Sequence, residues 1–349
     1  MKKAILPLAI AAALPMSALA AGPIDGKVYG KVNITAVNED HDDAGSSSED
    51  SWDLNSNASR IGFKGKTELS EGLYAIYKAE FEIQVDDGDK DGETFSQRNI
   101  YGGLTGNFGT IFAGKHDTVL KLAQKKVDLF NDLDGGDVKN WMSGETRASN
   151  VINYTTPKMG GFSASLMTVL GEDSDSDNDQ DGLLDSYSAG VSYSANGLYL
   201  GLARDENVDS GSQEKDFLDI TRIVATYKFD ALTLGAMIQS AEEGDNYSDN
   251  VTDATDDSYD EDSYVVSAAY KAGKFTWKLQ YGEGEYEEEN AAGAKTSESE
   301  EEWLQLGVDY KLGKKTKVYA YYSNGEEDDK LANTTDEVTR FGLGMEHKF

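Results

Sequence analysis

The sequence has 349 residues, with 64 acidic side chains, 32 basic side chains and no cysteine. Its formal net charge of −32 disfavours nucleic acid and anionic lipid as partners and attracts cations. The lack of cysteine excludes disulfides and thiolate metal sites, and 19 tyrosines and 12 phenylalanines argue against a disordered acidic chain.

The first 20 residues have the pattern of a secretory signal peptide. Lys2 and Lys3 precede an apolar run that ends in Ala-Leu-Ala at 18–20. A membrane anchor would need roughly 20 apolar residues, and this run is shorter and contains two prolines. We expect cleavage after Ala20, which takes the net charge from −32 to −34 and leaves residues 21–349 as one domain.

Period-two alternation recurs from residue 28 to the last residue and predicts β-strands. No segment after residue 21 is apolar and long enough for a transmembrane helix, so an exported chain that enters a membrane must form a closed barrel. We therefore predict an all-β, transmembrane antiparallel β-barrel of about 16 strands. The strands are expected near 24–37, 57–67, 73–86, 95–105, 109–116, 147–156, 162–170, 186–195, 198–205, 217–229, 231–241, 263–271, 274–283, 302–312, 316–323 and 337–349.

The connections between these strands are of two kinds. Turn segments led by tyrosine recur about once per hairpin, at Tyr154, Tyr193, Tyr227, Tyr270 and Tyr310. Between them lie long acidic segments, at 39–53, 242–262 and 283–301. Short turns with aromatic residues at one end and long loops at the other are typical of outer-membrane barrels, as is the alternating last strand that stops at Phe349.

One connection, between His116 and Arg147, is too long to be a simple turn. A long irregular connection in a compact domain usually lines a site or is disordered, and this one contains five large apolar residues and a Gly-Gly bend. We predict that this third loop folds inward and that its acids face a basic barrel wall. The acids are Asp128, Asp132, Asp134 and Asp137, and the wall carries Arg60, Arg98 and Arg147.

The three arginines are expected to point into the lumen. A guanidinium on the lipid side at mid-depth costs roughly 2–4 kcal/mol, and the neighbours on their strand faces are small or polar. The alternative is that they only brace the loop or pair at the surface. Opposed to carboxylates across water they would create a transverse field, and rings of charge set ion preference. Because acids predominate, we predict a preference for cations.

Several motifs resemble those of Gram-negative trimeric general porins. They are Tyr29-Gly30-Lys31-Val32, Arg60-Ile61-Gly62-Phe63-Lys64-Gly65 and Arg98-Asn99-Ile100-Tyr101-Gly102-Gly103-Leu104. The resemblance implies a homotrimer in the outer membrane that passes small hydrophilic solutes and ions by diffusion. It also implies a basic constriction wall at Lys31, Arg60, Arg98, Lys115 and Arg147. The chain departs from the family pattern in the loop core, which is Asp-Leu-Asp-Gly-Gly at 132–136 rather than Pro-Glu-Phe-Gly-Gly, and at Lys115, where arginine is common.

An acidic segment at 172–185 has part of the spacing of a calcium loop, at Asp177, Asp179, Asp181 and Asp185. The twelfth position is Ser188 where a bidentate glutamate is expected, and no flanking helices are predicted. The alternatives are a weak Ca²⁺ site and a solvated acidic loop. No cofactor is required, and divalent cations could bridge the acidic loops to lipopolysaccharide and outer-membrane lipid.

Other functions are disfavoured by the residues themselves. An enzyme would need a nucleophile and a base held together, but His41, His116 and His347 have no partner pattern. Two alternatives stay open: a substrate-specific channel, and a non-conducting structural or adhesive barrel.

Overall fold

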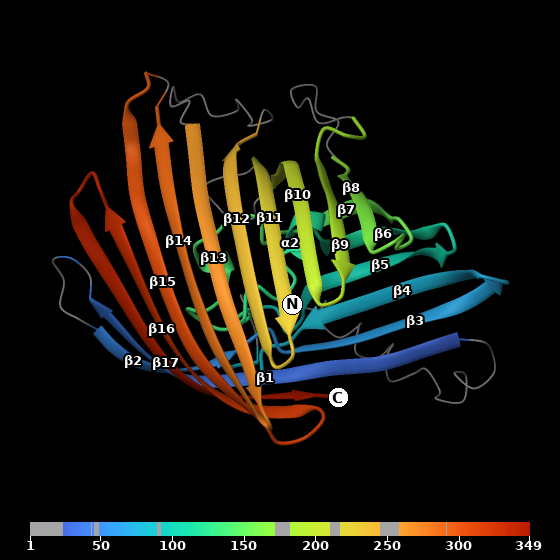
Figure 1. Ribbon diagram of the computed structural model, residues 1–349, viewed down its shortest axis with the longest axis horizontal. Helices are drawn as coiled ribbons and strands as arrows, with labels where there is room; N and C mark the ends of the chain where they lie inside the picture. Colours follow the sequence, from blue (N-terminus) through green and yellow to red (C-terminus); the bar gives the residue numbers. More distant parts are fainter. Residues whose placement is uncertain are drawn as a thin grey trace.

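The computed structural model describes residues 24–42, 44, 49–88, 92–171, 182–209, 217–244, 258–290 and 292–349. The expected signal peptide lies outside these residues. Seventeen antiparallel strands in the described parts form one closed sheet, in which the last strand pairs with the first (Figure 1). They are β1 (Ile24–Asp42), β2 (Glu49–Ser56), β3 (Arg60–Ser70), β4 (Leu73–Glu82), β5 (Ser96–Gly106), β6 (Gly109–Asp117), β7 (Arg147–Thr155), β8 (Phe162–Val169), β9 (Tyr187–Ala195), β10 (Leu198–Asp209), β11 (Phe217–Phe229), β12 (Leu232–Glu243), β13 (Ser258–Ala272), β14 (Phe275–Glu289), β15 (Lys295–Lys311), β16 (Thr316–Asp329) and β17 (Thr334–Lys348).

Strands β2 and β3 are two parts of one interrupted strand, because both pair with β1. The interruption at 57–59 includes Ala58, which has a φ of 47°. Asn57 and Ser59 are buried there and bond to Thr35 and Asn33 of β1. Counted this way the barrel has sixteen strands, which confirms the predicted fold and strand number.

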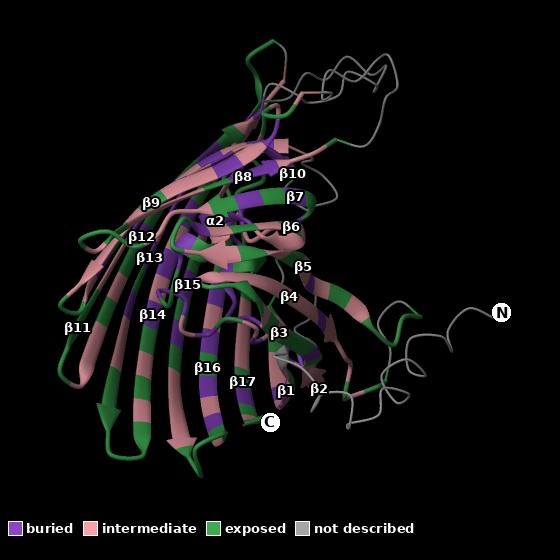
Figure 2. Ribbon diagram, turned by 90° about the vertical axis from the view of Figure 1, so that its right-hand side faces the viewer, coloured by how far each residue is buried: buried purple, intermediate pink, exposed green. Residues whose placement is uncertain are grey.

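The two faces of the sheet have opposite chemistry. Leu200, Leu202 and Ile223 point outward and are exposed, whereas Arg222 and Gln280 point inward and are buried. Figure 2 shows this alternation of exposed and buried residues along the strands. The outer face is thus apolar, as expected of a transmembrane barrel. The inner face carries polar residues and also a buried apolar patch that includes Ile220, Val224 and Met237. In the described residues, no helix has both the length and the apolar character needed to span a membrane.

The strands run further into the acidic segments than predicted. β1 extends to Asp42, β14 and β15 continue until Glu289 pairs with Lys295, and β13 begins at Ser258. The predicted loops at 39–53 and 283–301 are thus partly strand. Backbone pairing continues there although both faces are acidic, so the alternation that indicates a strand is lost.

The ring closes between β1 and β17, where Lys31 pairs with Lys348. Phe349 and Gly30 exchange backbone hydrogen bonds of 3.0 and 3.4 Å. A Cβ on Gly30 would lie 2.3 Å from the ring of Phe349, so only glycine leaves room for that side chain.

Candidate functional site

The connection between β6 and β7 packs against the inner face of the barrel. It begins with helix α2 (Val119–Ala123), capped by Thr118, whose hydroxyl accepts a hydrogen bond from the backbone N–H of Lys121. It also contains the short 3₁₀ helix η2 (Val138–Asn140). Nine of its apolar side chains are buried: Val119, Leu120, Ala123, Val127, Phe130, Leu133, Val138, Trp141 and Met142.

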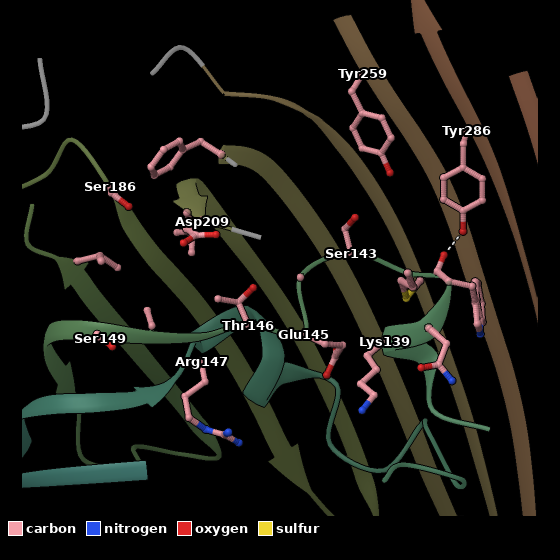
Figure 3. A pocket seen from close by; sticks show the side chains of 18 of the residues that line it. Lys139, Ser143, Glu145, Thr146, Arg147, Ser149, Ser186, Asp209, Tyr259 and Tyr286 are labelled. Atoms are coloured by element: carbon pink, nitrogen blue, oxygen red, sulfur yellow. Dashed lines mark hydrogen bonds between the residues drawn. The ribbon is translucent and has the colours of Figure 1, made fainter. Parts of the chain in front are cut away.

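Hydrogen bonds fix the connection to one side of the wall. The backbone N–H of Leu129 donates to Gln280 of β14 at 2.7 Å, and its carbonyl accepts from Lys278 at 3.1 Å. The hydroxyl of Tyr286 donates to the carbonyl of Trp141 (Figure 3). A second anchor on β16 is the hydroxyl of Tyr321, which donates to the carbonyl of Asp134 at 3.0 Å.

A buried ion pair holds the end of the connection. Arg222 of β11 has no exposed surface, and it donates to the carboxylate of Glu145 at 2.7 Å and to Gln239 at 2.8 Å. The third guanidinium nitrogen donates to the carbonyl of Ser143 at 3.0 Å. Burial raises the pKa of Glu145 although the charge of Arg222 lowers it. Arg222 was not among the site residues predicted from the sequence.

Asp132 reaches the basic wall on the opposite side. Its Oδ2 lies 2.6 Å from Nζ of Lys31 on β1 and 2.6 Å from a guanidinium nitrogen of Arg60 on β3. The backbone of Asp132 has a φ of 69°, a conformation that Asp tolerates better than most residues. Burial would raise the pKa of Asp132, but the charges of Lys31 and Arg60 lower it below its usual value.

Arg98 is paired with acids of the wall itself. Its guanidinium bonds to Glu82 and lies 3.3 Å from Glu80, both on β4. Glu80 also lies 3.3 Å from Lys78 and accepts a bond of 2.7 Å from the hydroxyl of Tyr29. Our sequence reasoning missed Glu80 and Glu82 as site residues, although alternation in 73–85 places both on the polar face.

Arg147 has a similar local partner. Its guanidinium lies 2.9 Å from Asp117, the last residue of β6, and donates to Asn99 at 2.8 Å. Asn99 in turn donates to Asp117 at 3.0 Å. The structure thus brings Lys31 and Arg60 to the loop acid Asp132, while Arg98 and Arg147 pair with strand acids.

The other predicted loop acids lie elsewhere. Asp128 and Asp137 are buried and accept backbone hydrogen bonds within the loop: Asp128 from Phe130 and Val138, and Asp137 from Asp132 and Lys139. Burial raises the pKa of both, and the charge of Asp137 raises that of Asp128 further. These two carboxyl groups brace the loop instead of facing the arginines.

Asp134 has partners near the β1–β17 seam. It accepts a 2.8 Å bond from Asn55 and lies 3.9 Å from the guanidinium of Arg340, which bonds to Glu39. Arg340 also packs on Gly135, where an added Cβ would lie 2.4 Å from the arginine Cδ. Arg340 was not predicted.

Lys115 lies apart from Lys31, Arg60 and Arg98. It pairs with Ile100 beside a register shift between Gly114 and His116, and it lines the larger of the two cavities described below. In the described part of the chain it has no ion pair. The next residue, His116, packs against Tyr101 and Phe112.

Two adjoining cavities follow from this arrangement. One, of 850 Å³, lies between Asp132 and Asp134 of the loop and Arg60, Arg98 and Arg147 of the wall. The other, of 1080 Å³, is lined by residues of the loop, β10, β14 and β15 (Figure 3). The cavities share four lining residues, Lys139, Asn140, Glu145 and Arg147, so they adjoin each other beside the loop.

Most of the calcium motif lies outside the described residues, namely Asp177, Asp179 and Asp181. Asp185 is described, and its carboxylate accepts a 2.5 Å bond from the backbone of Gly182. The hydroxyl of Ser188 accepts bonds from the backbone of Val119 and Leu120 at the start of α2.

Comparisons with known proteins agree with the geometry. The profile of a family described as Gram-negative porin matches residues 8–330. The major outer membrane protein P.IB of Neisseria meningitidis serogroup B is 25% identical over 373 residues, which cover all of both chains. An anion-selective porin from Comamonas acidovorans superposes with a TM-score of 0.71 at 22% identity, covering 93% of this chain and 100% of the other. The trimer form of OmpT from Vibrio cholerae superposes with a TM-score of 0.62 at 19% identity, covering 93% and 99%.

Proposed function

The chain belongs to the Gram-negative porin family, and we propose that this outer-membrane porin lets ions and small hydrophilic solutes diffuse across the membrane with a preference for cations. Family and fold point to a channel rather than to an enzyme. The observation that carries the proposed ion preference is the excess of carboxyl groups around the narrow cavity beside the loop.

The charges that line this cavity are unequal. Its basic residues are Arg60, Arg98, Lys121, Lys139 and Arg147, and its acidic residues are Glu82, Asp86, Asp87, Asp117, Asp132, Asp134, Asp137 and Glu145. Setting aside Asp137 and Glu145, whose pKa is raised, six carboxylates still face five cations. An acidic lining concentrates counter-ions, so cations should be favoured in the passage.

The opposed charges also give the constriction a transverse field. Arg60 and Arg98 lie on the β3–β5 wall, while Asp132 projects from the loop and meets Arg60 at 2.6 Å. A dipolar solute that enters the cavity is oriented by these fixed charges, because they are preorganised and do not relax as water does. Small polar solutes would pass more easily than apolar ones of equal size.

The preference of the structural neighbour does not settle that of this chain. The Comamonas acidovorans protein is described as anion-selective, but it shares 22% identity and thus a fold with this chain. Ion preference depends on side chains in the passage. The argument therefore rests on the acids named above.

A reversal-potential measurement tests the proposal. The refolded mature chain is inserted in a planar bilayer with a tenfold KCl gradient. A potential of the sign that K⁺ diffusion produces supports cation preference, and the opposite sign refutes it. A membrane without conductance would instead support a plugged structural or adhesive barrel.

We also propose a homotrimer. One of the matched structures is described as a trimer form, which is a property of that protein. If each inserted particle is a trimer with three passages, its conductance should rise in three equal steps. Single steps of one size would count against the trimer without affecting the ion preference.

The acidic outer ends of the strands suggest a further partner. β14 and β15 carry acids on both faces, and Glu287 meets Lys295 at 2.6 Å while Glu285 and Glu300 stand opposite each other. We propose that divalent cations bridge such carboxylates to lipopolysaccharide. EDTA should then loosen this association in isolated outer membranes, whereas an unchanged association would rule the bridge out.

A further inference from the structure

Lysines gather on the inner face of the barrel at the end with the short turns. The cross-strand register places nine there: Lys27, Lys64, Lys66, Lys78, Lys228, Lys271, Lys311, Lys317 and Lys348. The carboxylates on the same stretches, among side chains that the structure describes, are Glu68, Glu80, Asp309 and Glu346, and three of them pair with Lys78, Lys317 and Lys348. This mouth of the passage is therefore positively charged.

Three of these lysines stand directly opposite one another. Lys27 pairs with Lys64, and Lys64 pairs with Lys78, across β1, β3 and β4. Like charges in this position destabilise a sheet. Lys64 lies over the ring of Tyr29 at 4.8 Å, and neither Lys27 nor Lys64 has an ion pair within the described residues. Lys78 lies 3.3 Å from Glu80, so the positive charge of Lys27 and Lys64 is the uncompensated part of this row.

The opposite end of the passage is acidic. With Glu145 again set aside, the cavity of 1080 Å³ on the long-loop side is lined by four carboxyl groups, those of Asp209, Glu288, Glu301 and Glu327, and by three basic residues, Lys115, Lys139 and Arg147 (Figure 3). Most of the negative charge lies above the cavity, where six glutamates of β14 and β15 meet one lysine of the same stretches, Lys295: Glu283, Glu285, Glu287, Glu298, Glu300 and Glu302. Their register places them on the outer face of the sheet, so they act on the mouth through their field and not as its lining. The constriction at Asp132 separates this acidic end from the lysines.

We propose that this axial charge asymmetry makes the pore rectify, so that it conducts more current when the outer side is positive than when it is negative. The inference rests on the proposed conduction of ions. An outer positive potential drives cations in through the acidic end, where they are enriched, and anions in through the lysine end. Both ions then accumulate at the constriction and raise its conductance, whereas the reverse potential depletes it of both.

The dependence on salt follows from screening. The Debye length is about 30 Å in 0.01 M salt and about 3 Å in 1 M salt. The two charged ends act on the whole width of the passage only in dilute salt. We expect the ratio of currents at opposite potentials to be roughly two or more in 0.01 M KCl and about one in 1 M KCl, because screening removes both fields.

The experiment requires channels of known orientation. Since the chain has no cysteine, Ser299→Cys in the outer cavity gives a single thiol. A bulky, membrane-impermeant thiol reagent added to one compartment blocks this variant only when the outer end faces that compartment. Current is then recorded at equal positive and negative potentials in symmetric 0.01 M and 1 M KCl.

Two further variants test whether the lysines on the inner face cause the difference between the two currents. In Lys27→Gln/Lys64→Gln/Lys78→Gln the ratio in 0.01 M KCl should fall toward one while conduction persists. The matched control removes three lysines from turns at the same end, in Lys158→Gln/Lys314→Gln/Lys315→Gln, and should keep most of the asymmetry. Folding of both variants is checked by the resistance of the barrel to denaturation in detergent.

The outcomes separate the two proposals. Equal currents in dilute salt, a larger current with the outer side negative, or a ratio unchanged by the inner-face triple variant would each overturn the rectification and leave the channel intact. Absence of any current from the wild-type chain would overturn the proposed conduction itself.

Discussion

The carboxylate of Asp132 lies 2.6 Å from the guanidinium of Arg60, although 71 residues separate the two positions and only the barrel brings them together. Lys31 contacts the same oxygen at 2.6 Å. One acid from the loop thus balances two cations of the wall. This makes Asp132 the loop residue whose charge should matter most to a passing ion.

Asp132→Asn should shift the permeability ratio toward anions. A single charge about 4 Å from an ion in water is worth about 1 kcal/mol, which limits the shift to roughly fivefold. The reversal potential in a KCl gradient measures it. Asp230→Asn is a matched control, because Asp230 also has a positive φ, of 51°, but lies in a turn between β11 and β12. An equal shift in both variants would deny Asp132 a special role.

Arg222→Met should destabilise the barrel and its loop. The substitution leaves the carboxylate of Glu145 buried without its cation, which costs about 3–5 kcal/mol when one partner of a buried pair is removed. Urea unfolding in lipid vesicles measures the loss. Arg204→Met is the control, since that pair with Asp219 is partly exposed and should be worth about 1 kcal/mol or less. Adding Glu145→Leu should recover part of the loss, and no recovery would argue against an ion-pair origin.

Stability should fall with rising pH through the titration of Asp128. Its pKa is raised by burial and by Asp137, so the folded state holds this proton more tightly than the unfolded state. The free energy of unfolding therefore decreases as pH rises from the ordinary carboxyl range through the raised pKa. Asp128→Asn should flatten this decrease by on the order of 1 kcal/mol. Urea unfolding between pH 4 and 8 measures how the free energy of unfolding changes with pH. If this change is the same in Asp128→Asn as in wild type, Asp128 is not its source.

The lowered pKa of Asp132 predicts the opposite dependence of stability on pH. Lys31 and Arg60 hold it below its usual value, so its contribution to stability is present above the unfolded pKa and is lost only as pH falls through the lower folded value. Its charge, and the part of the cation preference that depends on it, should persist in mildly acidic solution. Reversal potentials of wild type and Asp132→Asn, recorded from pH 7 down to pH 4, measure this part of the cation preference. If the difference between the two proteins disappears in mildly acidic solution, the prediction is wrong.

Calcium titration addresses the acidic motif at 177–188. Ser188 occupies the twelfth position, and its hydroxyl already accepts two backbone hydrogen bonds from α2. We therefore expect wild type and Asp179→Ala to give equal heats when Ca²⁺ is added. A saturable heat that disappears in Asp179→Ala would establish the alternative, a weak Ca²⁺ site.

Strand periodicity explains which site residues the sequence could predict. Arg60 and Arg98 sit on strand faces with small or polar neighbours, and the inner face is where the structure places both. The same rule also places Glu80 and Glu82 on the inner face, where both contact Arg98. Family resemblance predicts Lys115 beside the other cations of the wall, whereas the structure places it in the larger cavity, beside a register shift that alternation could not reveal.

The loop acids could not be assigned in this way. An irregular segment has no period, so the direction of each carboxylate depends on local turns. The positive φ of Asp132 and of Gly135 turns one acid toward Lys31 and leaves Asp128 and Asp137 bonded to backbone N–H groups. Only the folded chain shows which of four similar aspartates meets the basic wall.

The pairing of β1 with β17 also bears on assembly. Lys31 and Lys348 become neighbours only after every intervening strand is in place, so joining this seam is the most nonlocal step in folding and should be slow. Until then both edge strands expose unpaired backbone groups that can template aggregation. A periplasmic chaperone that shields these edges would be expected to raise the yield of barrel more than one that only binds the apolar outer surface.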